Sequence, residues 1–302
     1  MKSVAGWLAN SALLRRGRRL YEANEEDYFL PLSKVEKLLA GGYLILRDYA
    51  AGRFPPTFAD QAKAYEGELA YRTSLKGLTV DQIRDGELRK PFWDARATGR
   101  YLRAYVKLLH FLESLELRPP ASLLELGCGT GWTAELLALN RYRVLGTSLA
   151  DWEIADAFRR RDGLRAKGLE VTLDFLVAPM ESVDAHLPPD RPFDGVFVFE
   201  ALHHAYSWER TIAAAHRVLR PGGWFLICNE PNLAHTLVSY RVGRLANTHE
   251  IGLSRARMLR QMREVGFTET RVFGSRLHAW VCAHWLAGRK ENRKLEKRVE
   301  RD

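Results

Sequence analysis

The sequence predicts an α/β fold, in which a mostly parallel sheet carries helices on both faces and follows a helical N-terminal region. Beyond residue 122, short apolar segments alternate with segments of helical spacing, which is typical of a parallel sheet covered on both sides. Before that point, residues 33–39, 81–88 and 100–115 have helical spacing. Pro119-Pro120 then ends the last of these helices, because proline cannot continue a helix and restricts the residue before it.

Five strands and three helices are expected in the α/β region. Ligands of such a sheet bind at the carboxyl ends of its strands, so the residues that follow each strand are candidate site residues. The predicted strands are Ser122–Leu126, Arg143–Leu149, Val171–Ala178, Gly195–Phe199 and Trp224–Asn229, and the predicted helices are Thr133–Asn140, Trp152–Lys167 and Trp208–Leu219.

The composition is that of a globular protein with a substantial core. Of the 302 residues, 46% are hydrophobic and 27% are charged, which argues against disorder as the main state. Three widely spaced cysteines without a CxxC pair make a disulfide framework or a zinc knuckle improbable. No apolar run approaches the ~20 residues of a membrane span, and the N-terminus lacks the pattern of a secretory signal. We therefore expect a cytoplasmic protein.

The net charge of +9 is concentrated at the two ends of the chain. Residues 1–20 contribute +5 and residues 276–302 contribute +4, so the 255 residues between them are neutral. A nucleic-acid enzyme usually carries its basic surface on or beside the catalytic domain, so a nucleic-acid substrate is not favoured. The basic ends are either solvated helices, which we favour, or contacts to an anionic membrane surface, an acidic partner or RNA.

A glycine-rich loop after the first predicted strand is the strongest local motif. Glycines at 127, 129 and 131 permit a tight turn and let a ligand approach the backbone. A dinucleotide-binding loop would require glycine where this chain has Trp132, so the spacing fits a nucleoside joined to an amino acid better than a pyrophosphate. Glu125, just before the turn, could pair with an α-ammonium group, or it could simply order the loop.

This loop resembles motif I of the class I S-adenosylmethionine-dependent methyltransferases, and three later motifs extend the resemblance. Phe193–Phe199 resembles the fourth strand of that family, and Leu202-His203-His204 resembles the Leu-His-His that often follows it. Arg217–Trp224 matches the helix, turn and fifth strand that come next. The motifs keep their order and separation from about residue 122 to 232, which makes them far more specific together than alone.

The resemblance implies a Rossmann-like, seven-stranded, mostly parallel sheet with an N-terminal helical cap, and S-adenosyl-L-methionine as the cofactor. No metal site is expected, because His235 and His249 lack metal-ligand spacing. The cofactor-binding residues that it indicates are Glu125, Gly127, Cys128, Gly129, Gly131, Trp132, Ser148, Leu149, Pro179, Met180, Glu181 and Glu200.

Two positions depart from the family pattern. Where the family usually has an acid that accepts hydrogen bonds from both ribose hydroxyls, this chain has Ser148, so binding of the ribose falls to Asp151, Glu153 or backbone groups. Where many relatives have Asp, this chain has Pro179. The backbone N–H of Met180 can still meet the adenine ring, and its neighbour Glu181 can accept from the adenine amine.

The candidate catalytic residues lie after the fourth and fifth strands. Methyl transfer needs alignment of the reactants, and a base when the acceptor is a hydroxyl. His203 and His204 are the candidate bases, with His204 marginally favoured, and one of them could instead be structural. Glu230 could orient the acceptor, act with a histidine or cap the following segment. His235 and His249 lack metal-ligand spacing.

We therefore expect an S-adenosylmethionine-dependent methyltransferase that acts on the oxygen of a small-molecule or glycan acceptor. The alternatives are an RNA or lipid methyltransferase, a non-catalytic cofactor-binding partner protein and, more distantly, a nicotinamide-dependent oxidoreductase. The sequence leaves the oligomeric state open. The predicted regions are a helical cap over 1–99, a core over 100–275 with a lid at about 232–256, and a basic extension over 276–302.

Overall fold

The computed structural model describes residues 11–55, 60–74, 76, 79–274 and 283–292. The first ten residues and most of 276–302 lie outside the described residues, whereas Arg15, Arg16, Arg18 and Arg19 of the predicted basic N-terminal stretch are described. The chain divides into two compact units. A helical unit comprises the described part of Met1–Asp85 together with Pro231–Gly252, and a sheet unit comprises Gly86–Glu230 and what is described of the chain from Leu253 onward.

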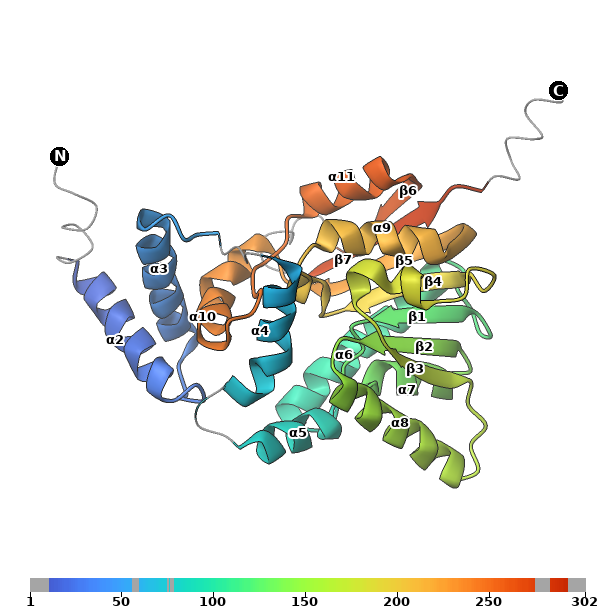
Figure 1. Cartoon of the computed structure of the whole chain (residues 1–302), viewed down its shortest axis with the longest axis horizontal. Coiled ribbons are helices and arrows are strands. Elements are labelled where there is room, and N and C mark those ends of the chain that lie inside the picture. The colour runs from blue at the N-terminus through green and yellow to red at the C-terminus, as the bar shows by residue number, and fades with distance from the viewer. Residues whose placement is uncertain (1–10, 56–59, 75, 77–78, 275–282, 293–302) are drawn as a thin grey trace. The chain divides into compact units, whose positions relative to one another are not determined.

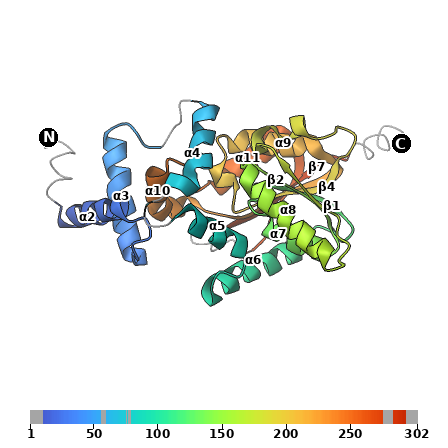
Figure 2. The same ribbon diagram turned by 60° about the horizontal axis from the view of Figure 1, so that its bottom comes forward.

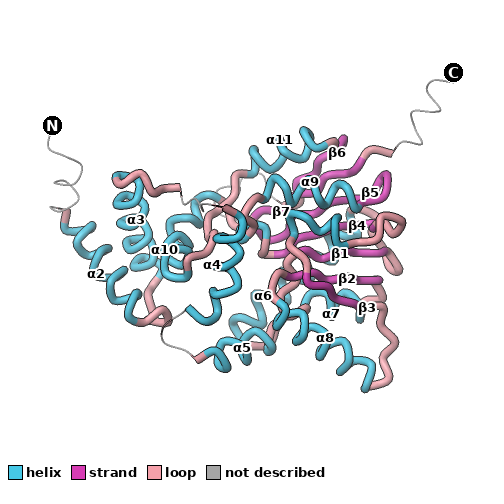
Figure 3. The backbone as a smooth tube through the Cα atoms, viewed as in Figure 1, coloured by secondary structure: helices cyan, strands magenta, loops and turns pink. Residues whose placement is uncertain are grey.

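The sheet unit contains a seven-stranded sheet in the order β3-β2-β1-β4-β5-β7-β6 (Figures 1 and 3). Strands β1 to β5 pair in parallel, whereas β7 runs antiparallel to both of its neighbours. The predicted mostly parallel, Rossmann-like sheet is thus confirmed. The strands are β1 Ser122–Leu126, β2 Arg143–Ser148, β3 Leu173–Val177, β4 Phe193–Phe199, β5 Leu219–Glu230, β6 Phe267–Val272 and β7 His284–Lys290.

Helices cover both faces of this sheet (Figures 1 and 2). Alternate residues of a strand point to opposite faces, so Leu123 packs in one buried cluster with α6, α7 and α8, and Leu124 in a second with α9 and α11. Both leucines are fully buried, as expected for a strand covered on both faces. The helices are α6 Ala95–Ser114, α7 Trp132–Leu139, α8 Asp151–Ala166, α9 Trp208–Val218 and α11 Arg255–Val265, with 3-10 turns at Met180–His186 and Leu202–His204.

Strand β5 begins five residues before the predicted strand. We expected Pro221-Gly222-Gly223 to form a turn that precedes the strand, and Gly222 does have a positive φ of 77°. Leu219, however, already pairs with Phe193 on β4, and pairing resumes at Trp224 after a shift of register. The turn is therefore an irregularity within β5, because β4 offers a hydrogen-bonding edge on both sides of it.

The helical unit consists of helices that approach one another closely at glycines. A Cβ on Gly41 would lie 1.8 Å from the carbonyl oxygen of Leu237, and one on Gly67 would lie 2.0 Å from that of Asn247. The connection predicted as a lid at 232–256 thus supplies a helix, α10, that packs on α3. The elements are α2 Ala12–Glu26, α3 Lys34–Ala50, α4 Gln61–Ser74, α5 Val80–Arg89, which crosses into the sheet unit, a 3-10 turn at Leu233–His235, and α10 Thr236–Ala246.

A buried carboxylate joins α3 to α10 within the helical unit. The side chain of Asp48 is fully buried and forms ion pairs with Arg47 at 2.9 Å, Arg53 at 3.1 Å and Arg244 at 3.3 Å. The hydroxyl of Tyr240 on α10 donates a fourth contact to Asp48 at 2.9 Å. These partners replace the water that the carboxylate loses on burial, so the cluster holds the two helices in one register.

In the part of the chain that the structure describes, no helix combines the length and the apolar character needed to cross a membrane. The longest of them, α6, has 20 residues but carries charged side chains along its length, among them Arg96, Arg103 and Lys107.

We predict that Asp48→Ala lowers the free energy of unfolding by roughly 1–3 kcal/mol, because it leaves the buried hydroxyl of Tyr240 without its acceptor, whereas the three arginines are partly exposed. Urea denaturation followed by circular dichroism measures this change. Glu66→Ala is the matched control, since its ion pair with Lys63 is exposed and its loss changes stability by at most about 1 kcal/mol. Equal losses in the two variants would show that the Asp48 cluster does not hold the helices together.

Candidate functional site

The predicted site residues gather at one edge of the sheet unit. Strands β1, β4 and β5 are parallel neighbours, so their carboxyl ends meet at the same edge. The glycine loop follows β1, the two histidines follow β4, and Glu230 is the last residue of β5. Three motifs that are far apart in the sequence therefore line one region, where ligands of such sheets bind.

The glycine loop has a shape that side chains would disrupt. Gly127, Gly129 and Gly131 have positive φ angles of 71°, 54° and 77°. A Cβ on Gly127 would lie 2.7 Å from the Cβ of Ala201, and one on Gly131 would lie 2.7 Å from the ring of Phe175. The loop thus needs glycine both for its backbone conformation and for close packing.

Cys128 and Trp132, two predicted cofactor-binding residues of this loop, are buried and take part in the core. Cys128 is 5% exposed and its backbone N–H donates to the carbonyl of Thr147 at 2.8 Å. Trp132 opens α7, and its ring centroid lies 5.5 Å from that of Tyr101 and 5.7 Å from that of Phe199. Their side chains hold the loop in place.

Glu125 carries the clearest sign of a missing ligand group. Its side chain is buried, and the hydroxyl of Thr133 and the backbone N–H of Ala134 donate to it. Its Oε2 atom is buried and has no hydrogen-bond partner among the residues that the structure describes. Burial raises the pKa of Glu125 to about 8. An unsatisfied buried acceptor beside a glycine cradle fits a ligand that brings an ammonium group, as S-adenosylmethionine does.

The predicted contacts after β2 and β3 are placed as follows. Ser148 ends β2 and is buried, and Leu149 follows it in the loop before α8. After β3, the side chain of Met180 reaches the glycine loop, with its Cε 3.2 Å from a Cβ on Gly127. Glu181 is buried and accepts from the backbone N–H of Ser207 at 3.4 Å, so it has a role in holding the chain.

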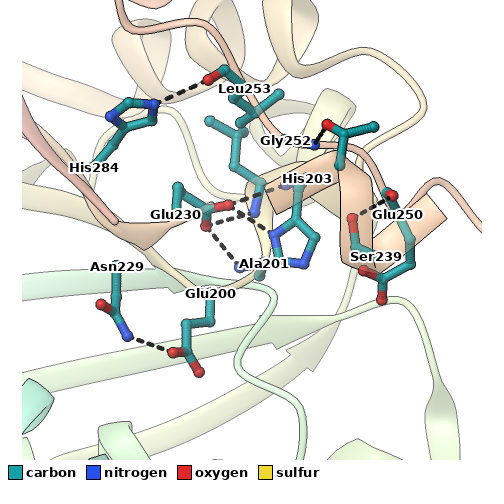
Figure 4. A network of polar contacts seen from close by, with 12 residues as sticks. Glu200, Ala201, His203, Asn229, Glu230, Ser239, Glu250, Gly252, Leu253 and His284 are labelled. Atoms are coloured by element: carbon teal, nitrogen blue, oxygen red, sulfur yellow. Dashed lines mark hydrogen bonds and ion pairs between the residues drawn. The ribbon is translucent and has the colours of Figure 1, made fainter. Parts of the chain in front are cut away.

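Glu230 organises the segment that carries the histidines (Figure 4). Its Oε1 accepts the backbone N–H groups of Ala201 at 2.7 Å and Leu202 at 2.9 Å. Its Oε2 accepts the backbone N–H of His203 at 3.2 Å and lies 2.8 Å from Nδ1 of the same residue. Burial alone would raise the pKa of Glu230, but His203 and these N–H groups hold it below its ordinary value. Glu230 is therefore a charged acceptor at the base of the loop.

The two histidines lie side by side, and the ring of His203 contacts Glu230. Their ring centroids are 4.2 Å apart. The contact between Nδ1 of His203 and the carboxylate makes Nδ1 the protonated nitrogen of the neutral ring, which leaves the lone pair on Nε2. The backbone N–H of His204 donates to the carbonyl of Ala201 at 3.1 Å.

Two of the three strands that end at the site have a left-handed residue other than glycine beside their last residue. Glu200 after β4 has a φ of 52°, and Asn229 near the end of β5 has a φ of 58°. The amide of Asn229 donates to Oε1 of Glu200, and burial raises the pKa of Glu200 (Figure 4). Left-handed residues of this kind are uncommon and gather at functional sites.

The sequence did not single out Asn229 or His284 as site residues. His284 opens β7 opposite Glu230, is buried, and places Nε2 2.9 Å from the carbonyl oxygen of Leu253. Burial lowers the pKa of His284, so it is a neutral donor that fixes the chain after α10. Asn229 could have been noticed, because asparagine at a strand end tolerates the left-handed conformation. His284 has no motif around it.

Comparison with known proteins gives a family match that includes the whole glycine loop and both histidines. The model of the family described as a methyltransferase domain matches residues 95–272. Among solved structures, the CurJ carbon methyltransferase covers 92% of this chain and 71% of its own, with a TM-score of 0.53 at 14% identity. That likeness shows a shared fold.

Curated relatives include both C- and O-methyltransferases. Sterol 24-C-methyltransferase ERG6B of Gibberella zeae is 32% identical over 127 residues, which are 41% of this chain and 31% of that protein. The ubiquinone biosynthesis O-methyltransferase of Bordetella pertussis is 28% identical over 162 residues, which are 51% of this chain and 64% of that protein. The chain thus spans about a third of the first relative and less than two thirds of the second.

We predict that binding of S-adenosylmethionine at pH 7 releases a proton from Glu125. The ammonium group of the cofactor favours the ionised carboxylate, whereas burial keeps the carboxyl protonated below pH 8 in the unliganded protein. The heat of binding in calorimetry will therefore change with the ionisation enthalpy of the buffer, and affinity will rise between pH 6 and 8.

Glu125→Gln supplies the control for this proton. The variant binds with a heat that does not depend on the buffer. The pKa of Glu125 is about 8 in the folded protein and ordinarily 4.5. The unliganded wild type therefore loses stability as the pH rises between these two values, by up to ~1.4 kcal/mol per pH unit. Glu125→Gln lacks this loss, so its melting temperature rises relative to that of the wild type from pH 5 to pH 8. A buffer-independent heat in the wild type would contradict the assignment.

Proposed function

Because the chain belongs to the methyltransferase-domain family, whose members use S-adenosylmethionine as methyl donor, we propose that it methylates a hydroxyl oxygen of a small-molecule or glycan acceptor. The observation that carries this proposal is the contact between His203 and Glu230. A buried carboxylate that holds one imidazole nitrogen as a donor prepares the other nitrogen to accept a proton. A hydroxyl acceptor requires such a base, because its proton must be removed; alignment of the reactants does not require one.

The contact also distinguishes between the two histidines. The sequence favoured His204 marginally, whereas the geometry favours His203. The ring of His203 contacts the carboxylate of Glu230, and that carboxylate is fixed in turn by the backbone N–H groups of Ala201 and Leu202. We therefore assign the base to His203 and the role of positioning residue to Glu230.

The proposed reaction is a displacement at the methyl carbon. S-adenosylmethionine supplies a methyl group on a positively charged sulfur. The acceptor oxygen forms a bond to the methyl carbon while the carbon–sulfur bond breaks, and the sulfur keeps that electron pair. His203 Nε2 takes the hydroxyl proton, and Glu230 stabilises the resulting imidazolium through Nδ1–H. The proton then leaves His203 to water.

A lipid acceptor is the second candidate, and the sterol relatives favour it. The proteins named as sterol 24-C-methyltransferases transfer the methyl group to carbon, and the identity to one of them is 32% over 127 residues. A hydroxyl acceptor gives a product with a methyl–oxygen bond, whereas the lipid acceptor gives a product with a methyl–carbon bond. An RNA acceptor rests on the basic ends of the chain, and most of those residues lie outside the described ones.

We predict that His203→Ala lowers kcat by about 10²- to 10⁴-fold and leaves the Kd of S-adenosylmethionine within about threefold. The physical reason is that the side chain acts on the acceptor proton and not on the cofactor. Glu230→Gln lowers both kcat and stability, because its NH2 group must face N–H donors that the carboxylate accepted from. Single-turnover kinetics and calorimetry measure the two quantities. His186→Ala, at an exposed histidine, is the control and keeps the wild-type rate.

The acceptor itself is found with a labelled methyl group. S-adenosylmethionine with a ¹³C-methyl group is incubated with fractionated cell extract, and the labelled product is isolated and examined by mass spectrometry and NMR. A methyl carbon bonded to oxygen supports the proposal. A methyl bonded to carbon, together with full activity of His203→Ala, would replace it by the lipid C-methyltransferase.

A further inference from the structure

The end of β2 lacks the acid that the family resemblance predicts. Ser148 is the last residue of β2, it is buried, and its backbone carbonyl accepts the N–H of Ala178 at 2.9 Å. A ribose presents two neighbouring hydroxyls, and a carboxylate offers a separate oxygen to each of them, whereas serine offers one neutral oxygen to both. The ribose of the cofactor therefore needs another acceptor at this place.

A carboxylate from the next helix occupies the neighbourhood of Ser148. The hydroxyl of Ser148 donates to Oε2 of Glu153 at 2.5 Å. Glu153 lies in the first turn of α8, where the exposed backbone N–H groups and the helix dipole favour a negative charge. Ser148 thus uses its only donor to hold the carboxylate of Glu153 beside the end of β2.

The second oxygen of this carboxylate lies toward the glycine loop. A Cβ built on Gly129 would lie 3.9 Å from Oε1 of Glu153. Gly129 has a φ of 54°, and its neighbour in the loop, Cys128, donates its backbone N–H to the carbonyl of Thr147, one residue before Ser148. Glu153 is therefore held between the end of β2 on one side and the backbone of the glycine loop on the other.

The order of the strands places the ribose at the same point. The amino-acid part of the cofactor is expected at the glycine loop after β1, and the adenine after β3. Strand β2 lies between β1 and β3 in the sheet. The sugar that joins the two parts must then pass the end of β2, where Ser148 and Glu153 meet.

We propose that Glu153 binds the ribose diol of S-adenosylmethionine in this protein, and that Ser148 is its positioning residue. One carboxylate offers an oxygen to each hydroxyl, where serine offers a single neutral oxygen, and charge-assisted bonds of this kind are stronger than neutral ones. The acid that the family usually supplies from the end of β2 is here supplied from five residues further along, at the start of α8. The serine that takes the usual place holds the carboxylate of Glu153.

The test compares two ligands that differ only in the diol. Calorimetry gives the Kd of S-adenosylhomocysteine and of its 2′,3′-dideoxy analogue for each purified variant. For Glu153→Gln we expect a loss of about tenfold or more for S-adenosylhomocysteine and less than about twofold for the dideoxy analogue. The unchanged second value also shows that the variant folds. For Ser148→Ala the loss is smaller and has the same selectivity.

Three further variants make the result decisive. Asp162→Asn alters an exposed acid further along α8 and leaves both Kd values unchanged. A loss in Asp151→Asn that is confined to S-adenosylhomocysteine would assign the diol to Asp151 and overturn the proposal. Ser148→Asp restores the usual acid, so it weakens binding when Glu153 is present, because the two carboxylates repel, and recovers it when combined with Glu153→Gln. Equal losses for both ligands in Glu153→Gln would show a structural role and overturn the proposal. So would a wild-type Kd in that variant, or failure of Ser148→Asp to rescue it.

Discussion

The buried carboxylate of Glu230 is the interaction on which the geometry of the site depends. It has no lysine or arginine among its described partners, and its charge is stabilised by three backbone N–H groups and one imidazole. An isolated buried charge would be very unfavourable, so the segment 201–203 can only adopt a conformation that aims its N–H groups at the two oxygens. The position of His203 follows from this arrangement.

That arrangement in turn requires β4 and β5 to be neighbours. Glu230 ends β5, and its partners begin immediately after β4, so only adjacent parallel strands bring them together. Glu200 and Asn229 turn away from extended geometry at the same level, and the bond between their side chains ties the two turns to each other. The unfavourable backbone conformations are thus placed where the chain must leave the sheet and present side chains to a ligand.

Much of the sheet could be predicted, because its central strands are apolar runs bounded by glycine or proline. Four of the five predicted strands lie within two residues of the observed bounds. The start of β5 was missed since pairing with β4 continues across Pro221-Gly222-Gly223. Strand β6, with Thr268, Glu269 and Arg271 at the sheet edge, has no such apolar run, so the residues themselves did not reveal it.

The site was predictable where a motif marked it and not where folding alone creates it. The glycine loop, Glu125, His203, His204 and Glu230 were all candidates from the sequence. Which histidine meets the carboxylate depends on a contact between residues 27 positions apart. The assembly of Pro231–Gly252 with the N-terminal helices depends on much longer separations, which periodicity does not report.

The helical unit is assembled from two segments that leave the ribosome at different times. Asp48 and Tyr240, which bond to each other, are 192 residues apart in the chain. Helices α2 and α3 leave the ribosome early, but the helix that covers Ala40, Gly41 and Leu44 is made only after β5. Until then the nascent N-terminal helices must keep an apolar surface uncovered while the whole parallel part of the sheet is translated. The helical unit is begun before the sheet unit and completed after β5.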